Sequence, residues 1–166
     1  NSYFFNKNNS GLYFNANLGV TYNLFFYDFE STKYTRLTNE KAVLSKFFYD
    51  TKYDFILFTK STATAPDEIC MMDTDGSNIR RISNLNPWLS RFTLGRVEVI
   101  NWKSSDGVEC EGLLYYPAKY DSSKKYPLIV QLHGGPAGSY TYRFQSDYIS
   151  YSQVLSGKGY FVFQPN

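Results

Sequence analysis

The sequence predicts a mixed fold of two parts, an all-β unit over residues 1–86 and an α/β unit over residues 97–166. Three observations predict this division. The first part consists of short strand-like runs between polar turns, with an internal repeat and no sustained helical period. The second part contains a strand, a glycine turn, a helical pattern and another strand in succession. Residues 87–96 lack strand alternation and hold a proline and a glycine, so we expect a linker there.

The composition is typical of a folded protein and gives no sign of a charged partner. Of the 166 residues, 43% are hydrophobic and 19% are aromatic, and the aromatic share favours strands. The net charge of +2 argues against nucleic acid and an anionic membrane as partners, and no apolar run has the length of a membrane span. Cys70 and Cys110 form no Cys-x-x-Cys pair and no histidine accompanies them, so we expect free thiols, no metal and no cofactor. The chain starts without methionine, so the sequence leaves the compartment and a signal peptide open.

The first part is predicted to form seven short strands. They are GLYFNAN (11–17), YNLFFYDFE (22–30), KYTRLT (33–38), LSKFFYD (44–50), DFILFTKS (54–61), EICMMDT (68–74) and NIRRIS (78–83). Asp73 and Asp75 beside Gly76 suggest a calcium loop at first sight. An EF-hand needs more oxygen ligands and a distal glutamate, so a hairpin turn is the better interpretation.

An internal repeat organises these strands. Residues 26–38 align with residues 71–83, and the alignment pairs Asp28 with Asp73 and Arg36 with Arg81. A period of roughly 40–50 residues with about four strands per unit is typical of β-propeller blades. The first part therefore predicts about two blades. Because a propeller needs at least about four blades to close, we expect further blades upstream of this chain.

The second part is predicted to open with a hairpin, in which VEVINWK (97–103) and VECEGLLYY (108–116) flank the turn SSDG (104–107). The run PLIVQLH (127–133) is apolar nearly throughout, which suits a strand buried on both faces. A helix is expected near 144–157, with Gly157 at its end and one face formed by Phe144, Tyr148, Tyr151 and Leu155. The run YFVFQ (160–164) returns as a strand, so a parallel βαβ unit follows the hairpin.

Four motifs of this part stand in a specific order: SSDG, YP, HGGP (133–136) and GYFVFQPN (159–166). In this order and spacing they resemble the start of the catalytic domain of prolyl oligopeptidase family serine peptidases, and most of all the acylaminoacyl peptidase and dipeptidyl aminopeptidase branches. The run DEICMMDTDGSNIRRIS (67–83) is similar to the propeller blades of the same enzymes. The resemblance implies the last blades of a β-propeller followed by the N-terminal part of an α/β-hydrolase domain with a mixed sheet.

The chain departs from that family pattern at the catalytic triad. The Gly-x-Ser-x-Gly nucleophile motif is absent, and the aspartate and histidine that follow it in the family are absent with it. Ser122 and Lys125 match Ser-x-x-Lys, but they lie in a polar loop, and Ser139 lacks the flanking glycines of a nucleophile elbow. We therefore expect a fragment that stops before the nucleophile and is inactive by itself.

The glycine turn, Gly134 and Gly135, is the part of the chain that could take part in catalysis. Acyl transfer needs backbone donors placed where the oxyanion develops, and in α/β-hydrolases one of them comes from the loop after the third strand. From the pattern alone, Gly134 and Gly135 fit an oxyanion loop and a plain strand-to-helix turn equally well. The resemblance favours the oxyanion loop, with the Gly135 N–H as donor and Gly134 shaping the turn. His133 precedes the nucleophile position, so the Ser-Asp-His order excludes it as triad base and implies that it supports the loop.

Three functions compete. The resemblance implies a serine peptidase that acts on short peptides through an acyl-enzyme. An α/β-hydrolase esterase would use the same glycine turn, although simple esterases lack the preceding blades. A propeller interaction module on a degenerate hydrolase fold is the non-enzymatic alternative. A homo-oligomeric parent protein is compatible with all three.

Overall fold

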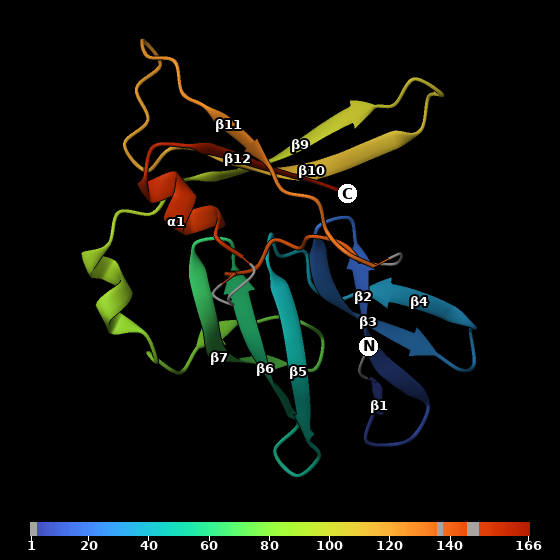
Figure 1. Cartoon of the computed structure of the whole chain (residues 1–166). Helices are drawn as coiled ribbons and strands as arrows, with labels where there is room; N and C mark the ends of the chain where they lie inside the picture. Colours follow the sequence, from blue (N-terminus) through green and yellow to red (C-terminus); the bar gives the residue numbers. More distant parts are fainter. Residues whose placement is uncertain (1–2, 136–137, 146–149) are drawn as a thin grey trace.

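The computed structural model describes residues 3–135, 138–145 and 150–166, which form two β-sheets joined by a short linker (Figure 1). The strands of the first sheet are β1 (Tyr3–Phe5), β2 (Gly11–Leu18), β3 (Thr21–Asp28), β4 (Lys33–Arg36), β5 (Val43–Asp50), β6 (Phe55–Thr62), β7 (Ala65–Asp73) and β8 (Arg80–Arg81). They form two antiparallel meanders, β1–β4 and β5–β8, joined by one parallel bridge between Tyr22 and Val43. All seven predicted strands are present. The sequence pattern missed β1, because three residues are too few to show alternation.

The predicted repeat reappears in the hydrogen bonds of the two meanders. The Thr38 hydroxyl accepts the backbone N–H of Leu24 at 2.9 Å. At equivalent positions 45 residues later, the Ser83 hydroxyl accepts the backbone N–H of Ile69 at 2.8 Å. The repeat is therefore present in the structure as well as in the sequence. In each meander, the hydroxyl accepts a backbone N–H of the third strand, as a carbonyl of a neighbouring strand would.

A second pair of contacts repeats in the same way. The Asn23 amide oxygen accepts the N–H of Glu40 at 2.8 Å, and the Glu68 carboxylate accepts the N–H of Leu85 at 2.9 Å. Each of these side chains also accepts the hydroxyl of its own repeat. That hydroxyl is the main cause that lowers the pKa of Glu68. In both meanders, the same pair of hydrogen bonds therefore holds the segment that follows the fourth strand.

We expect Thr38→Val to destabilise the chain by about 1–3 kcal/mol, because it leaves the buried Leu24 N–H without an acceptor. Thr35→Val is the matched control, since Thr35 is exposed on β4. Urea unfolding followed by circular dichroism measures both. Equal unfolding free energies for the two variants would contradict the role of the Thr38 hydroxyl.

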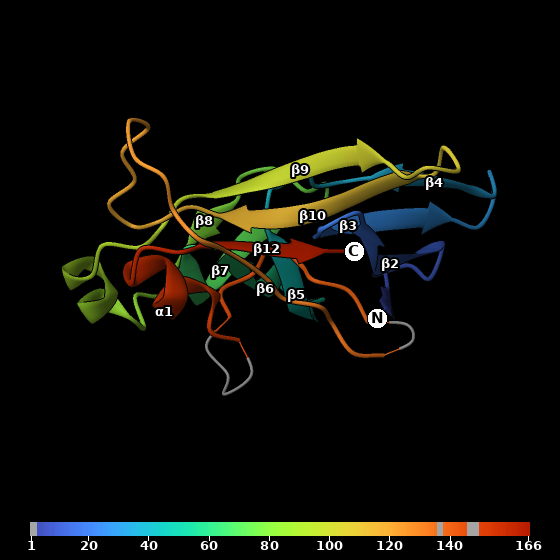
Figure 2. The ribbon, with the colours of Figure 1, turned by 45° about the horizontal axis from the view of Figure 1, so that its top comes forward.

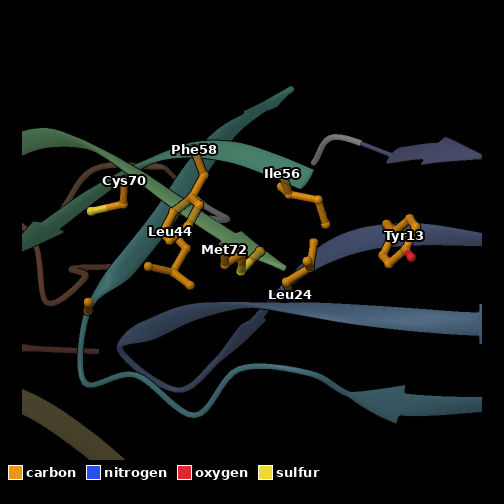
Figure 3. Close-up of a cluster of buried hydrophobic side chains, with 8 residues drawn as sticks. Tyr13, Leu24, Leu44, Ile56, Phe58, Cys70 and Met72 are labelled. Atoms are coloured by element: carbon orange, nitrogen blue, oxygen red, sulfur yellow. The ribbon is translucent and has the colours of Figure 1, made fainter. Parts of the chain in front are cut away.

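The core of the first sheet collects one or two side chains from each central strand (Figure 3). Its fully buried members among the described residues are Leu24, Ala42, Leu44, Ile56, Phe58 and Met72. Aromatic rings extend this core, and Phe47 stacks on Phe58 with centroids 5.7 Å apart. The high aromatic content noted in the sequence is thus used for packing between strands.

The second sheet has the order β11-β12-β10-β9 and contains β9 (Val97–Lys103), β10 (Glu109–Tyr115), β11 (Leu128–Val130) and β12 (Phe161–Pro165). β9 and β10 form the predicted hairpin. The Gly107 N–H donates to the Ser104 carbonyl at 2.9 Å and closes the turn between them. β11 and β12 are parallel and are connected through helix α1 (Ser152–Gly157). The predicted βαβ unit and the mixed sheet are therefore present.

The strand after Pro127 differs from its prediction. β11 is not buried on both faces, because Leu128 and Val130 are 56% and 53% exposed. The reason is its place in the sheet: β11 pairs with β12 alone and forms an edge of the sheet in this chain. An apolar run reveals a strand, but the strand's neighbours come from distant parts of the sequence.

The helix is also shorter than predicted. It covers six residues, 152–157, so Phe144 and Tyr151 lie outside it, and Tyr148 lies outside the described residues. The Phe144 N–H donates to the Ser61 hydroxyl of β6 at 3.0 Å, which holds Phe144 against the first sheet. Among the described residues of the predicted helical face, Leu155 packs against the core of the second sheet.

The second sheet lies across one end of the first (Figure 2). The predicted linker begins with a 3₁₀ helix, Pro87–Arg91. Val20 and Ala63, at the tips of two equivalent hairpins of the first sheet, are 3% and 1% exposed because they belong to the core of the second sheet. Gln153 of α1 adds a polar contact, since its amide bonds the backbone of Ala63 and of Gly95. Among the described residues, no helix is long and apolar enough to cross a membrane.

Candidate active-site loop

The glycine turn lies directly after the carboxyl end of β11, where α/β sheets place their functional groups. The Gln131 N–H donates to the Phe163 carbonyl at 2.9 Å and so prolongs the pairing of β11 with β12 up to the turn. Gly134 and Gly135 are both exposed, and apart from its chain neighbours no described residue has an atom within 4 Å of the position that a Cβ on Gly134 would occupy. The backbone of the turn is therefore accessible to a ligand. The last residue of HGGP, Pro136, lies outside the described residues.

His133 lies against this loop. Its Nδ1 is 2.9 Å from the Gly134 carbonyl oxygen, within hydrogen-bond distance. Its ring meets the Tyr140 ring edge-on, with centroids 5.7 Å apart. The imidazole thus connects the two legs of the loop, from Gly134 to Tyr140.

Gly138 is a close-packing position that the sequence pattern did not single out. A Cβ there would lie 2.1 Å from the Gly134 carbonyl oxygen and 3.2 Å from His133 Nδ1. The second leg of the loop therefore approaches the first so closely that only glycine fits. The one available sequence signal was the glycine itself, three residues after the Gly134–Gly135 pair.

Asn166 holds the second leg of the loop. Its Oδ1 accepts the Tyr140 N–H at 2.6 Å, and its Nδ2 donates to the Tyr140 carbonyl at 2.9 Å. The Asn166 N–H in turn donates to the Glu111 carbonyl at 2.9 Å. Sequence reasoning missed this role, although Asn166 ends the QPN run that carries part of the family resemblance.

A buried polar cluster lies at the base of the same loop. Gln164 of β12 is fully buried, and its Nε2 lies 3.1 Å from Gln131 Oε1, 2.9 Å from Gln145 Oε1 and 2.9 Å from Ser152 Oγ. Gln131 and Gln145 stand at the two ends of the loop segment. The Gln164 side chain thus ties both ends to β12, while its own Oε1 has no partner among the described residues.

Beyond the loop, the chain crosses to the first sheet (Figure 1). The Tyr142 N–H donates there to the Val20 carbonyl at 2.6 Å. Burial raises the pKa values of Tyr115, Tyr140 and Tyr142, so all three phenols stay protonated at neutral pH. The Tyr115 hydroxyl is buried without a partner among the described residues. These tyrosines pack the floor of the site and supply no base.

The remaining sequence candidates lie apart from the loop or at its rim. Ser122 is exposed in the loop between β10 and β11, outside any helix. Ser139 is exposed and lines a cavity of about 400 Å³ between the loop and the first sheet, together with Asn15, Tyr22, Val43, Ser45, Thr141 and Arg143. His133 Nδ1 lies within hydrogen-bond distance of the Gly134 carbonyl of its own loop, and among the described residues no hydrogen bond joins this histidine to Ser122 or Ser139.

The turn after β7 has the predicted hairpin form. The Gly76 N–H donates to the Asp73 carbonyl at 3.0 Å, and the Ser77 N–H donates to the Asp75 carboxylate at 2.8 Å. Within the described part of the chain, no group of three or more His, Cys, Asp or Glu residues could hold a metal ion.

The chain is similar to known peptidases in sequence and in fold. No family model matches it. It is 27% identical over 124 residues to the uncharacterized peptidase YuxL of Bacillus subtilis. This alignment covers 74% of this chain and 18% of that protein. It is 28% identical over 171 residues to the dipeptidyl-peptidase 4 of Giardia intestinalis. This alignment covers 87% of this chain and 21% of that protein. Among solved structures, it matches the Pyrococcus horikoshii acylaminoacyl peptidase with a TM-score of 0.77 and 26% identity, over 95% of this chain and 24% of that one.

The relatives are peptidases of the prolyl oligopeptidase family, and this chain is similar to them in sequence and in fold. The chain spans only about a fifth to a quarter of the length of the relatives it matches.

Proposed function

We propose that this chain is part of a serine peptidase and supplies the oxyanion-hole loop of that enzyme. In this proposal residues 1–86 are about two blades of a β-propeller, residues 87–96 are the linker, and residues 97–166 are the N-terminal part of an α/β-hydrolase catalytic domain. The catalytic serine, aspartate and histidine come from another part of the protein. The substrates are short peptides, which form an acyl-enzyme with the serine.

The observation that carries the proposal is the exposed glycine turn at the carboxyl end of β11. Peptide hydrolysis passes through a tetrahedral oxyanion, and preorganised N–H donors stabilise it where the charge develops. Gly134 and Gly135 are exposed among the described residues, so in this proposal a substrate carbonyl approaches the N–H of Gly135. The strand, the close contact of Gly138 and the clamp by Asn166 hold this turn in place before any substrate arrives.

His133 serves as a support in this mechanism. Its Nδ1 is already engaged with the Gly134 carbonyl, and its ring rests on Tyr140. The order of the triad in the fold also places the base after the nucleophile. The histidine therefore orients the peptide groups next to the oxyanion site.

The experiment that tests the function uses the full-length protein. We expect it to react with a fluorophosphonate probe and to hydrolyse aminoacyl or dipeptidyl chromogenic amides, whereas the 166-residue chain alone does neither. Hydrolysis of acyl esters without any amide hydrolysis would favour the esterase alternative. A full-length protein that neither labels nor turns over any of these substrates would identify a non-catalytic module.

Gly134→Ala in the full-length protein is expected to lower kcat for amide substrates by about tenfold or more, because the added methyl group obstructs the oxyanion site. The fold has room for this methyl group, since no atom lies within 4 Å of it. The melting temperature is therefore expected to stay unchanged. Steady-state kinetics with differential scanning fluorimetry checks both results, and an unchanged kcat would remove Gly134 from the site.

A further inference from the structure

We propose that Asn166 is a positioning residue for acyl transfer: it fixes, through Tyr140, the loop that presents Gly134 and Gly135 to the substrate. This inference rests on the proposed function and deepens it. It is carried by the pair of hydrogen bonds between the Asn166 amide and the Tyr140 backbone.

The first step of the argument is that Asn166 is itself held in place. Its N–H donates to the carbonyl of Glu111, directly beyond the paired residues Gly112 and Pro165 of β10 and β12. The residue is therefore anchored to the two central strands of the second sheet. An amide on such a support has few orientations available, so little conformational entropy opposes its contacts.

The second step concerns what the Asn166 side chain does. Its amide satisfies both the N–H and the C=O of Tyr140, as a neighbouring β-strand would. From Tyr140 the contacts continue to the His133 ring and from His133 Nδ1 to the Gly134 carbonyl. A displacement of Tyr140 is thus transmitted to the peptide groups at the oxyanion site.

The third step is a second support from the same strand. Gln164 lies in β12, and Asn166 directly follows the last residue of that strand, Pro165. Gln164 bonds Gln131 and Gln145 at the two ends of the loop segment, and Asn166 bonds Tyr140 within it. Gln164 is fully buried and keeps an Oε1 without a partner among the described residues, which an apolar side chain would avoid. A buried amide oxygen without a partner costs stability. We infer that Gln164 is present because its side chain positions the two ends of the loop segment.

The test compares Asn166→Ala and Asn166→Asp with the matched control Asn101→Ala, all in the full-length protein. Asn101 is exposed on β9 of the same sheet. Hydrogen exchange at the Tyr140 amide and steady-state kinetics on a chromogenic amide are measured for each, and melting temperatures confirm that the variants are folded. Asn166→Asp keeps the acceptor for the Tyr140 N–H but loses the donor to its carbonyl.

For Asn166→Ala we expect amide exchange at Tyr140 to become about tenfold faster. We expect kcat to fall about tenfold while KM changes less than about threefold, because oxyanion donors act in the transition state. Asn166→Asp is expected to lie between wild type and Asn166→Ala in exchange, and Asn101→Ala to match wild type in every readout.

The possible outcomes separate this inference from the proposed function. An active parent protein whose Asn166→Ala variant keeps the wild-type kcat refutes the positioning role alone. Unchanged exchange at Tyr140 refutes the clamp, whatever happens to kcat. A parent protein without any turnover refutes the proposed function, and the positioning role falls with it.

Discussion

Gly138→Ala in the full-length protein is expected to lower kcat for amide hydrolysis by about 10²-fold, since a misplacement of catalytic groups by about 1 Å can cost that much. The new Cβ would lie 2.1 Å from the Gly134 carbonyl oxygen, and both atoms are fixed to the backbone of the loop. No side-chain rotation can relieve this contact, so the two legs of the loop must separate. The separation moves the peptide groups of Gly134 and Gly135 away from the site where the oxyanion forms.

The control for this prediction is Gly157→Ala. Gly157 ends α1 in the same unit, and no atom lies within 4 Å of the place that a Cβ on this residue would take. We expect this variant to keep the wild-type kcat. Because the new contact forces the backbone of the loop apart, Gly138→Ala is also expected to lower the melting temperature, whereas Gly157→Ala is expected to keep it. A Gly138→Ala enzyme with full activity would show that the loop geometry does not govern catalysis.

Phe58→Ala is expected to destabilise the chain by about 3–5 kcal/mol, the usual loss when a buried phenylalanine is truncated. The Phe58 side chain is 1% exposed, stacks on Phe47 and belongs to the core shared by β3, β5, β6 and β7. Its removal leaves a cavity between strands that cannot all move inward. Urea unfolding followed by tyrosine and tryptophan fluorescence measures the loss.

Phe48→Ala on the neighbouring strand β5 is the matched control. The Phe48 side chain is 59% exposed, so little apolar surface returns to water when it is truncated. We expect its unfolding free energy to stay within about 0.5 kcal/mol of wild type. Similar losses for both variants would contradict the assignment of Phe58 to the core.

The strands of the first sheet could be predicted because alternation and polar turns are local signals. The repeat was visible because matching residues, such as Asp28 and Asp73, recur at a fixed offset and close equivalent turns. The helical period was misleading at Phe144, because a hydrogen bond to Ser61, 83 residues away, holds this residue outside the helix. The exposure of β11 could not be predicted from the sequence either, because it depends on which strands lie beside β11 in the sheet.

The glycine turn of the candidate site could be located from its own residues, since His133, Gly134 and Gly135 are consecutive. What holds the turn could not be predicted. Asn166 lies 26 residues from Tyr140, and no local pattern connects the two. Sequence therefore identifies the groups that face a substrate, whereas their support depends on contacts that only the folded chain creates.

The placement of Val20 and Ala63 has a consequence for the modularity of the protein. These hairpin tips belong to the first sheet by sequence, yet they complete the core of the second. Excising residues 1–86 would leave the apolar face of the second sheet open to water, so residues 97–166 are not an autonomous folding unit. A gene fusion or deletion at the linker would therefore separate two segments of sequence but remove two members from the core of the second sheet.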